Sequence, residues 1–232
     1  LKTFRVADGF RIEQVAAEPL LTDPVAMAFD ENGRLFLVEM RGYSEDDQAM
    51  LGQVRVLEDQ DGDGRFDRGR VLIEGLSWPT AITCYRGGVF VGAAPDIWYF
   101  KDQDGDGRAD IREKVFTGFG RGNVQGLLNT FKWGLDNRVH GATSSSGASV
   151  TRLADLPLDK NASQGGAEAK ASQKAEGSGE ALSLRGRDFA FDPRTLDMRA
   201  TSGGGQHGMS FNAWGDKFVC SNSNHIQAVL FE

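Results

Sequence analysis

An acidic nine-residue loop occurs twice in the sequence, and this repeat limits the folds that the chain can adopt. Residues 59–67 read DQDGDGRFD, and residues 102–110 read DQDGDGRAD, 43 residues later. Strand-like segments flank both copies, VRVLE and RVLIEGL around the first and IWYFK and KVFTGF around the second. A repeat of this length, with strands on both sides of a loop, is typical of a β-propeller blade. We therefore predict an all-β chain built from propeller blades.

A second pattern, an apolar strand followed by a tight turn and another apolar strand, occurs four times. Gly, Asn and Asp at the turns tolerate the positive φ that two-residue hairpin turns require. We interpret each hairpin as the two inner strands of a blade, and the acidic loops as the connections between outer strands. The predicted hairpins cover residues 24–39, 79–93, 125–142 and 207–221, with turns at Asn32-Gly33, Gly87-Gly88, Asp136-Asn137 and Gly215-Asp216.

This register divides the chain into parts of one partial propeller domain. We predict a lead-in with a lone closing strand at Phe10–Leu20 over residues 1–22, followed by blade 1 (23–76), blade 2 (77–119), blade 3 (120–203) and the start of blade 4 (204–232). Because an open arc of blades leaves sheet edges exposed, we expect an incomplete arc of about four blades from a larger propeller of six or seven.

Blade 3 contains an unusual segment. Residues 154–180 are rich in Ala, Gly, Ser, Gln, Lys and Glu and contain no aromatic residue, which predicts a disordered surface insertion. The outer strands of this blade are then expected around Asp188 to Arg199, with a turn at Asp192-Pro193.

Composition excludes several classes of protein. The net charge of −7 disfavours binding to nucleic-acid phosphates, and no apolar run approaches the roughly 20 residues that span a bilayer. No signal peptide is visible, but the chain begins at Leu1, so we expect a mature form or a fragment.

Cys84 and Cys220 lie in apolar strand patterns, which favours buried free thiols over a disulfide. Without a CxxCH motif, the chain has no site for covalent haem attachment.

The acidic loops predict calcium sites. The DxDxDG pattern places three carboxylates on alternating residues, with Gly64 and Gly107 at the bends, and such oxygen ligands suit Ca²⁺. The second loop carries Glu113 at position 12 of the D-x-D-x-D-G-x5-E pattern, whereas the first has Arg70 there. The alternative is an acidic turn without metal. The predicted ligands are Asp59, Asp61, Asp63 and Asp67 in the first loop, and Asp102, Asp104, Asp106, Asp110 and Glu113 in the second.

A second candidate site lies where loops from several blades meet at one mouth of the central channel. His207 begins an inner strand after the glycines at 203–205, and a neutral imidazole there can take the proton of an alcohol as its hydride leaves. The alternative is a histidine that hydrogen-bonds loop carbonyls. His225 is a further candidate, whereas His140 matches strand-core positions. The predicted cofactor-binding residues are Arg121, Asn123, Gln125, Gln206, Asn222 and His225.

Three segments together show a family resemblance. The string GGGQHGMSFNAWGDKFVCSNSNHIQ from Gly203, the DxDGDG hairpins, and the opening FRIEQVAAEPLLTDPVAMAFDENGRLFLVEM resemble the N-terminal propellers of planctomycete and verrucomicrobial "membrane-bound dehydrogenase" proteins, the PVC-type haem-binding group. More distantly, the chain is similar to soluble quinoprotein glucose/sorbosone dehydrogenases.

The resemblance implies an exported protein of the periplasm or cell surface that binds Ca²⁺ and oxidises a small-molecule sugar or alcohol, with pyrroloquinoline quinone as its cofactor. It also implies a cytochrome c domain outside this chain. In the distant quinoprotein relatives the base is a histidine at the start of an inner strand, and His207 is the matching position. The absence of a redox motif favours the alternative of a non-catalytic propeller that binds glycans or a partner protein. A purely structural fragment is the third reading.

Overall fold

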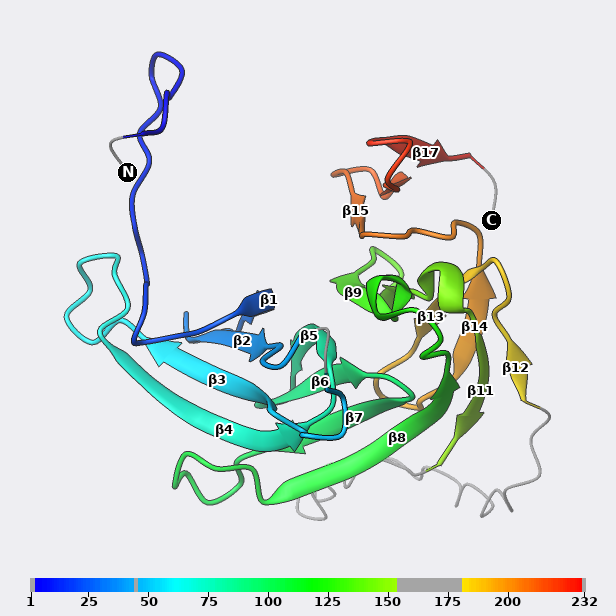
Figure 1. The fold of residues 1–232 in the computed structure, drawn as a ribbon, viewed down its shortest axis with the longest axis horizontal. Coiled ribbons are helices and arrows are strands. Elements are labelled where there is room, and N and C mark those ends of the chain that lie inside the picture. The colour runs from blue at the N-terminus through cyan, green and yellow to red at the C-terminus, as the bar shows by residue number, and fades with distance from the viewer. Residues whose placement is uncertain (1–2, 44–45, 154–180, 231–232) are drawn as a thin grey trace, which may run out of the picture. The chain divides into compact units, whose positions relative to one another are not determined.

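The chain folds almost entirely into antiparallel β-strands (Figure 1). The computed structural model describes residues 3–43, 46–153 and 181–230, and within these ranges it contains seventeen strands and two short 3-10 helices. Among the described residues, no helix has the length and apolar character needed to cross a lipid bilayer. The predicted all-β class is confirmed. The chain divides into two compact units, unit 1 (Leu1–Ala93 and Phe100–Arg112) and unit 2 (Ala94–Tyr99 and Glu113–Glu232).

Unit 1 contains a four-stranded sheet followed by a hairpin. The strands of the sheet lie in chain order, each antiparallel to the next, and the first acidic loop joins the third strand to the fourth. Two of the four predicted hairpins therefore form here. The elements are β1 (Pro24–Phe29), β2 (Leu35–Glu39), β3 (Gly52–Glu58) and β4 (Arg68–Leu76) in the sheet, and β5 (Pro79–Tyr85) and β6 (Gly88–Ala93) in the hairpin.

The turn between β5 and β6 lies one residue earlier than the sequence predicted. Tyr85 pairs with Gly88, which leaves Arg86 and Gly87 as the two turn residues, both at positive φ (48° and 73°). Positive φ at both central positions is the geometry of a type I′ turn. The prediction of Gly87-Gly88 was therefore wrong by one position, because Arg86 adopts a conformation that glycine would adopt more easily.

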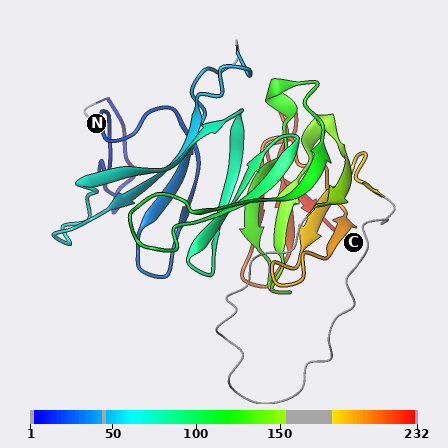
Figure 2. The ribbon, with the colours of Figure 1, turned by 90° about the horizontal axis from the view of Figure 1, so that it is seen from below.

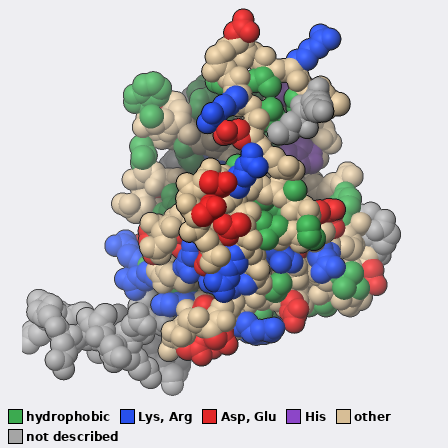
Figure 3. Space-filling model, turned by 90° about the vertical axis from the view of Figure 1, so that its left-hand side faces the viewer, with side chains coloured by type: hydrophobic (Ala, Val, Ile, Leu, Met, Phe, Trp, Pro, Cys, Tyr) green, Lys and Arg blue, Asp and Glu red, His purple; other side chains and the backbone are tan. Residues whose placement is uncertain are grey.

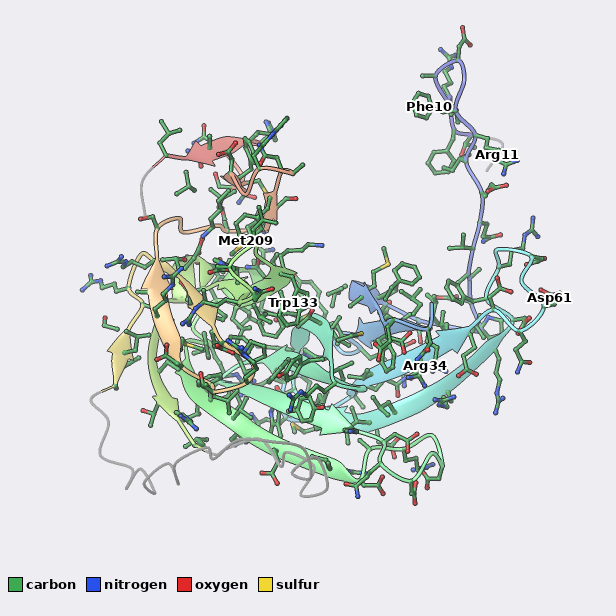
Figure 4. The ribbon with its side chains drawn as sticks, turned by 180° about the vertical axis from the view of Figure 1, so that it is seen from behind. Phe10, Arg11, Arg34, Asp61, Trp133 and Met209 are labelled. Atoms are coloured by element: carbon green, nitrogen blue, oxygen red, sulfur yellow. The ribbon has the colours of Figure 1, made fainter. Side chains whose placement is uncertain are left out.

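The lone strand predicted at Phe10–Leu20 does not form. Residues 3–23 contain no strand, and Phe10 is 77% exposed. Of residues 10–20, only Val15 has a long-range backbone hydrogen bond within the described chain, accepting the amide of Phe66 from the first acidic loop (2.8 Å). A strand needs a ladder of such bonds along one partner, and a single bond does not supply it. Phe10 and Arg11 project from this segment in Figure 4.

Unit 2 contains three groups of paired strands. The other two predicted hairpins form, β9 with β10 and β15 with β16, and so does the outer pair β13–β14. The groups are β9 (Asn129–Trp133), β10 (Val139–Ala142), β13 (Asp188–Phe191) and β14 (Met198–Thr201); β15 (Met209–Phe211), β16 (Lys217–Val219) and β17 (Gln227–Val229); and β8 (Ile111–Phe119), β11 (Ala148–Arg152) and β12 (Leu182–Ser183). Strands β7 (Asp96–Lys101) and β8 flank the second acidic loop and run through both units.

The β11–β12 pair was not predicted. Ala148 and Thr151 of β11 pair with β8, and Val150 pairs with Leu182 of β12. The sequence signal was weak because each strand is short and the two are separated by residues 154–180. The disordered insertion predicted over 154–180 lies outside the described residues.

Aromatic side chains form the core of unit 2. The rings of Phe189 and Phe191 on β13 stand 6.5 Å apart, and Phe131 of β9 meets both edge-on at 6.3 and 6.2 Å. Phe116 and Phe119 of β8 pack against the same two rings. Each fully buried phenylalanine contributes about 1.5–3 kcal/mol of transfer free energy, so this cluster fastens β8, β9 and β13 together. Figure 2 shows the β9–β10 and β13–β14 hairpins of this unit side by side.

Both cysteines are free thiols and half-buried. Burial, with a smaller contribution from Asp30 and Glu31, raises the pKa of Cys84 to about 12. This thiol therefore stays protonated at neutral pH and behaves as a small apolar group.

Candidate functional site

The two acidic loops share one internal hydrogen-bond pattern. In the first, the carboxylate of Asp59 accepts the amides of Gly62 (2.7 Å) and Gly64 (2.9 Å). In the second, Asp102 accepts the amides of Gly105 (2.7 Å) and Gly107 (2.9 Å). The first aspartate thus closes each loop by the same two bonds, as the sequence repeat would lead one to expect.

The carboxylate oxygens of each loop converge. One oxygen from each of three aspartates lies within 4.8 Å of the others, and the groups are Asp59, Asp61 and Asp67 in the first loop and Asp102, Asp104 and Asp106 in the second. Asp61 lies at the solvent-exposed end of its hairpin (Figure 4), and Figure 3 shows acidic side chains interspersed with Lys and Arg on one face. An all-oxygen donor set of this kind fits a hard cation of the calcium type.

The other three predicted ligands lie outside the converging groups. Asp63 accepts the Arg65 amide (2.8 Å), and Asp110 accepts the Gln103 amide (2.7 Å). Glu113 lies half-buried on β8, three residues after the end of the loop. Neither Asp63 nor Asp110 belongs to the converging groups, so six of the nine predicted ligands are brought together.

Arg70, which replaces the position-12 carboxylate of the first loop, lies against the second. Its Nη1 donates to Oε1 of Glu58 (2.8 Å), and a Cβ placed on Gly107 would meet its Cδ at 2.8 Å. Gly107 also has a φ of +93°, so close approach and backbone conformation both call for glycine there.

The segment around His207 in unit 2 is fastened at several points. The carbonyl of Gln206 accepts the side-chain amide of Asn129 (3.1 Å) and the hydroxyl of Ser144 (3.2 Å). The amides of Gln206 and His207 both donate to the carbonyl of Cys220 (3.0 and 3.3 Å). The backbone at His207 is therefore held from β9, from the short helix η2 (Ser144–Ser146) and from the end of β16.

His207 itself is paired with Asn222. Its Nε2 lies 2.8 Å from Oδ1 of Asn222. The backbone amide of Asn222 donates to Oε1 of Gln206 (3.2 Å). With the amide oxygen of Asn222 facing the ring, Nε2 of the neutral imidazole carries the proton, and Nδ1 keeps its lone pair. His207 is exposed to solvent.

Two residues next to this segment have strained backbone conformations. Thr130 has a φ of +55° and Ser144 a φ of +54°, and for a β-branched residue such as threonine a positive φ is a true outlier. Ser144 bonds the Gln206 carbonyl, and Oγ1 of Thr130 lies 3.3 Å from the Cβ position of Gly208. Strained residues cluster at functional sites, where the surroundings hold them in place.

The other predicted residues stand in the neighbouring connections. Asn123 caps the short helix η1 (Val124–Gly126) by accepting the Gln125 amide (3.0 Å). Gly126 packs against the hydroxyl of Ser145, which brings η1 beside η2. Arg121 is half-buried two residues before Asn123. His225 is exposed, and within the described part of the chain it has no hydrogen-bond partner.

Sequence reasoning missed a second histidine pair. His140 is 3% exposed, as expected for a core position, and its Nε2 lies 3.0 Å from Oδ1 of Asp136, across the β9–β10 turn. Burial raises the pKa of Asp136, but the hydrogen bond and charge of His140 and the charge of Arg199 outweigh it and hold that pKa below its usual range. The spacing of four residues across a hairpin turn was the signal that could have revealed this pair.

Comparison with known proteins places the chain in a family. The family model described as "Domain of unknown function (DUF7133)" matches residues 1–232. The chain belongs to this family. No curated protein matches this DUF7133 chain.

Solved structures show what the DUF7133 chain is similar to. The PQQ domain of pyranose dehydrogenase from Coprinopsis cinerea matches with a TM-score of 0.56 and 15% identity, over 97% of this chain and 51% of that one. The PQQ-bound aldose sugar dehydrogenase from Streptomyces coelicolor has a TM-score of 0.48 and 16% identity, over 95% and 84%. An enzyme of family AA12 from Trichoderma reesei has 0.44 and 11%, over 95% of both chains.

The first of these matches identifies the fold. The DUF7133 chain shares the β-propeller fold of quinoprotein sugar dehydrogenases, as its repeats predicted. It spans about half the length of the pyranose dehydrogenase domain.

Proposed function

We propose that this chain is the propeller portion of an exported dehydrogenase that oxidises a hydroxyl group of a sugar or alcohol, with His207 as the general base. The observation that carries the proposal is the His207–Asn222 pair, an exposed imidazole oriented by an amide on a multiply hydrogen-bonded segment. The shared fold with a PQQ domain of a pyranose dehydrogenase supports the same reaction class. At that level of identity the fold alone carries over, so the chemistry rests on the site.

The proposed step is a balanced two-electron oxidation. The proton of the substrate hydroxyl moves to Nδ1 of His207 while the hydrogen on the adjacent carbon leaves as hydride, and the C–O single bond becomes a carbonyl. Asn222 keeps the opposite nitrogen protonated, so that Nδ1 is the basic one throughout. When bound, a quinone supplies the acceptor for the hydride.

The predicted cofactor-binding residues carry the chemical groups that a quinone cofactor needs. Pyrroloquinoline quinone carries three carboxylates and two adjacent carbonyls, which need cations and hydrogen-bond donors. Arg121 offers a guanidinium, and Asn123, Gln125 and Gln206 offer amides. In the proposed enzyme Arg121 binds a carboxylate and the amides bind carbonyl oxygens.

Calcium has a structural role in this proposal. Each converging aspartate group would bind one Ca²⁺ and fix the hairpin that carries it, β3–β4 or β7–β8. Membership of the haem-binding group, export, and electron transfer to a cytochrome c domain outside this chain belong to the same proposal and rest on the resemblance of the sequence.

Dye-coupled oxidation of a panel of sugars and alcohols tests the proposed chemistry. The protein is reconstituted with pyrroloquinoline quinone and Ca²⁺, and His207→Ala is compared with Lys132→Ala, which removes an exposed side chain of the same unit outside the predicted site. Loss of a general base lowers kcat by about 10²–10⁴-fold. Equal rates for His207→Ala and the unaltered protein would refute the assigned base.

One observation favours a second function, glycan binding without catalysis. Trp214 is 83% exposed, Leu135 72% and Trp133 43%, and Gly215 beside Trp214 packs on the side chain of Leu135. Exposed tryptophan rings provide flat apolar surfaces of the kind that bind sugars by stacking. Sugar binding that persists in His207→Ala and is lost in Trp214→Ala, without any turnover, would favour this function.

A further inference from the structure

A buried ion pair lies directly behind the segment that carries His207. Lys217 of β16 is 8% exposed and Asp188 of β13 is fully buried, and Nζ of Lys217 lies 2.7 Å from Oδ2 of Asp188. The ammonium group also donates to the carbonyl of Ser202 (2.7 Å) and to Oγ1 of Thr201 (3.4 Å). All three donors of the lysine are thus used, and two of the acceptors lie where β14 ends and the glycine run begins.

The partner carboxylate holds the middle of the same segment. Oδ1 of Asp188 accepts the amide of Gly205 (3.2 Å). Gly203 passes so close that a Cβ there would lie 2.0 Å from Oδ2 of Asp188 and 2.9 Å from Nζ of Lys217, and its φ is +144°. The two charged groups therefore pack directly against the backbone of the glycine run, and no larger residue fits at position 203.

The strand that carries Lys217 also holds the far end of the segment. Three residues after Lys217, the carbonyl of Cys220 accepts the amides of Gln206 and His207, and the amide of Cys220 donates to the carbonyl of Gly208 (3.2 Å). Strand β16 and the residue that follows it therefore hold residues 202–208 at both ends. A shift of β16 relative to β13 would move the His207 backbone, and with it the imidazole.

Stability alone does not explain a buried pair of this kind. Removing two charges from water costs several kcal/mol per ion, and well-packed apolar residues often replace such pairs with no loss of stability. What the pair provides, and apolar side chains would not, is four directed bonds to Gly205, Thr201, Ser202 and one another.

We propose that Lys217 and Asp188 are positioning residues, whose ion pair fixes the glycine run at 203–205 and so holds His207 in register with Asn222. The role in turnover rests on the proposed function of His207, but the positioning itself is measurable without turnover. It predicts that loss of the pair frees the imidazole while the sheets around it stay folded.

The test compares Lys217→Met with the double variant Asp188→Leu/Lys217→Met. The single variant leaves a buried carboxylate unpaired and can unfold the region, whereas the double variant replaces the pair by apolar side chains and keeps the unit folded. Arg138→Met is the control, because it removes another ion pair of unit 2, between the half-buried Arg138 and the exposed Asp197 (3.2 Å), whose two residues lie outside 202–208.

Two readouts report on the segment itself. We expect the Gly205 amide of the double variant to exchange with solvent about tenfold faster or more. We expect the ¹⁵N shifts of the His207 imidazole to move from one fixed tautomer to a mixture. Arg138→Met should show neither change. Unchanged exchange and an unchanged tautomer in the folded double variant would overturn the proposal.

Turnover, where the unaltered protein shows it, supplies a third readout. Displacement of a catalytic group by about 1 Å costs about 10²-fold in rate, so kcat should fall by that factor in the double variant while KM changes little. If the unaltered protein oxidises nothing, the proposed function fails, and the exchange and ¹⁵N measurements still decide the positioning role.

Discussion

The Nε2 atom of His207 lies 2.8 Å from Oδ1 of Asn222, and the backbone amide of Asn222 in turn donates to the side chain of Gln206, the residue before the histidine. These bonds close a ring between the start of β15 and the end of β16. The imidazole is therefore oriented by residues that its own strand pair supplies.

Removing the Asn222 side chain should release the ring. In Asn222→Ala, Nε2 loses its acceptor, the neutral tautomer is no longer fixed, and we expect dye-coupled kcat to fall by about 10²-fold. Asn224→Ala is the control, because Asn224 lies in the same connection and uses its backbone rather than its side chain. A rate in Asn222→Ala equal to that of Asn224→Ala would rule out the orienting role.

Calcium should stabilise unit 1 and should do so through the converging aspartates. A ligand at a hundredfold excess over its Kd adds about 2.7 kcal/mol to the free energy of unfolding, so added Ca²⁺ should raise the Tm and a chelator should reverse the change. Asp59→Asn and Asp102→Asn should each remove one binding event in a calorimetric titration, and Asp8→Asn, which removes an exposed charge elsewhere, should remove none. No shift of the Tm on adding Ca²⁺ would contradict the metal assignment.

Gly141 should not tolerate a methyl group. A Cβ at this position of β10 would lie 2.3 Å from the ring of Phe189, in the aromatic core of unit 2. Overpacking of this kind costs about 1–3 kcal/mol, which we expect as a lower midpoint of denaturant unfolding for Gly141→Ala. Gly122→Ala is the control, since nothing lies within 4 Å of its Cβ position. Equal midpoints for the two variants would show that the side chains around Gly141 rearrange to accommodate the methyl group without loss of stability.

Acid should weaken the turn between β13 and β14. The side-chain hydrogen bonds of Arg194 lower the pKa of Asp192 to about 2, against the usual value of about 3.9. A carboxylate whose pKa is lowered by folding stabilises the native state fully above its unfolded pKa, and this stabilisation disappears as pH falls through the folded value.

The corresponding measurement is thermal unfolding of the unaltered protein and of Asp192→Asn between pH 7 and pH 2. The difference in stability between them should be constant down to about pH 4 and should shrink toward pH 2. A difference that stays the same across the whole range would mean that the Asp192–Arg194 pair does not titrate as proposed.

Local patterns were sufficient to predict the strands of the four hairpins, and they were insufficient for contacts between distant residues. The hairpins and the acidic loops followed from residues close in sequence, such as Asp59 and Gly64. The pairing of Lys217 with Asp188 spans 29 residues and no local pattern signals it. The predicted strand at Phe10–Leu20 was wrong because an alternation of apolar residues does not reveal whether a partner strand is available to pair with it.

The same limit applies to the candidate site. His207 was singled out because the sequence predicted it at the start of an inner strand, whereas the structure begins that strand, β15, two residues later at Met209. The structure adds what the pattern lacked: Asn222 as its partner, Cys220 as the acceptor of its backbone amide, and the strained Thr130 and Ser144 on neighbouring elements. Strain arises when tertiary contacts override local preference, so a reading of local preference cannot detect it.

The position of Arg70 connects the two acidic repeats, because this residue follows the first loop and packs against the second. Replacing Arg70 by glutamate would complete the twelve-residue pattern of the first loop, yet it would also remove the side chain that packs against Gly107 of the second. Exchanging the twelve-residue pattern of one loop for that of the other would therefore alter both hairpins. The difference between the loops at position 12 affects the first hairpin and the second together.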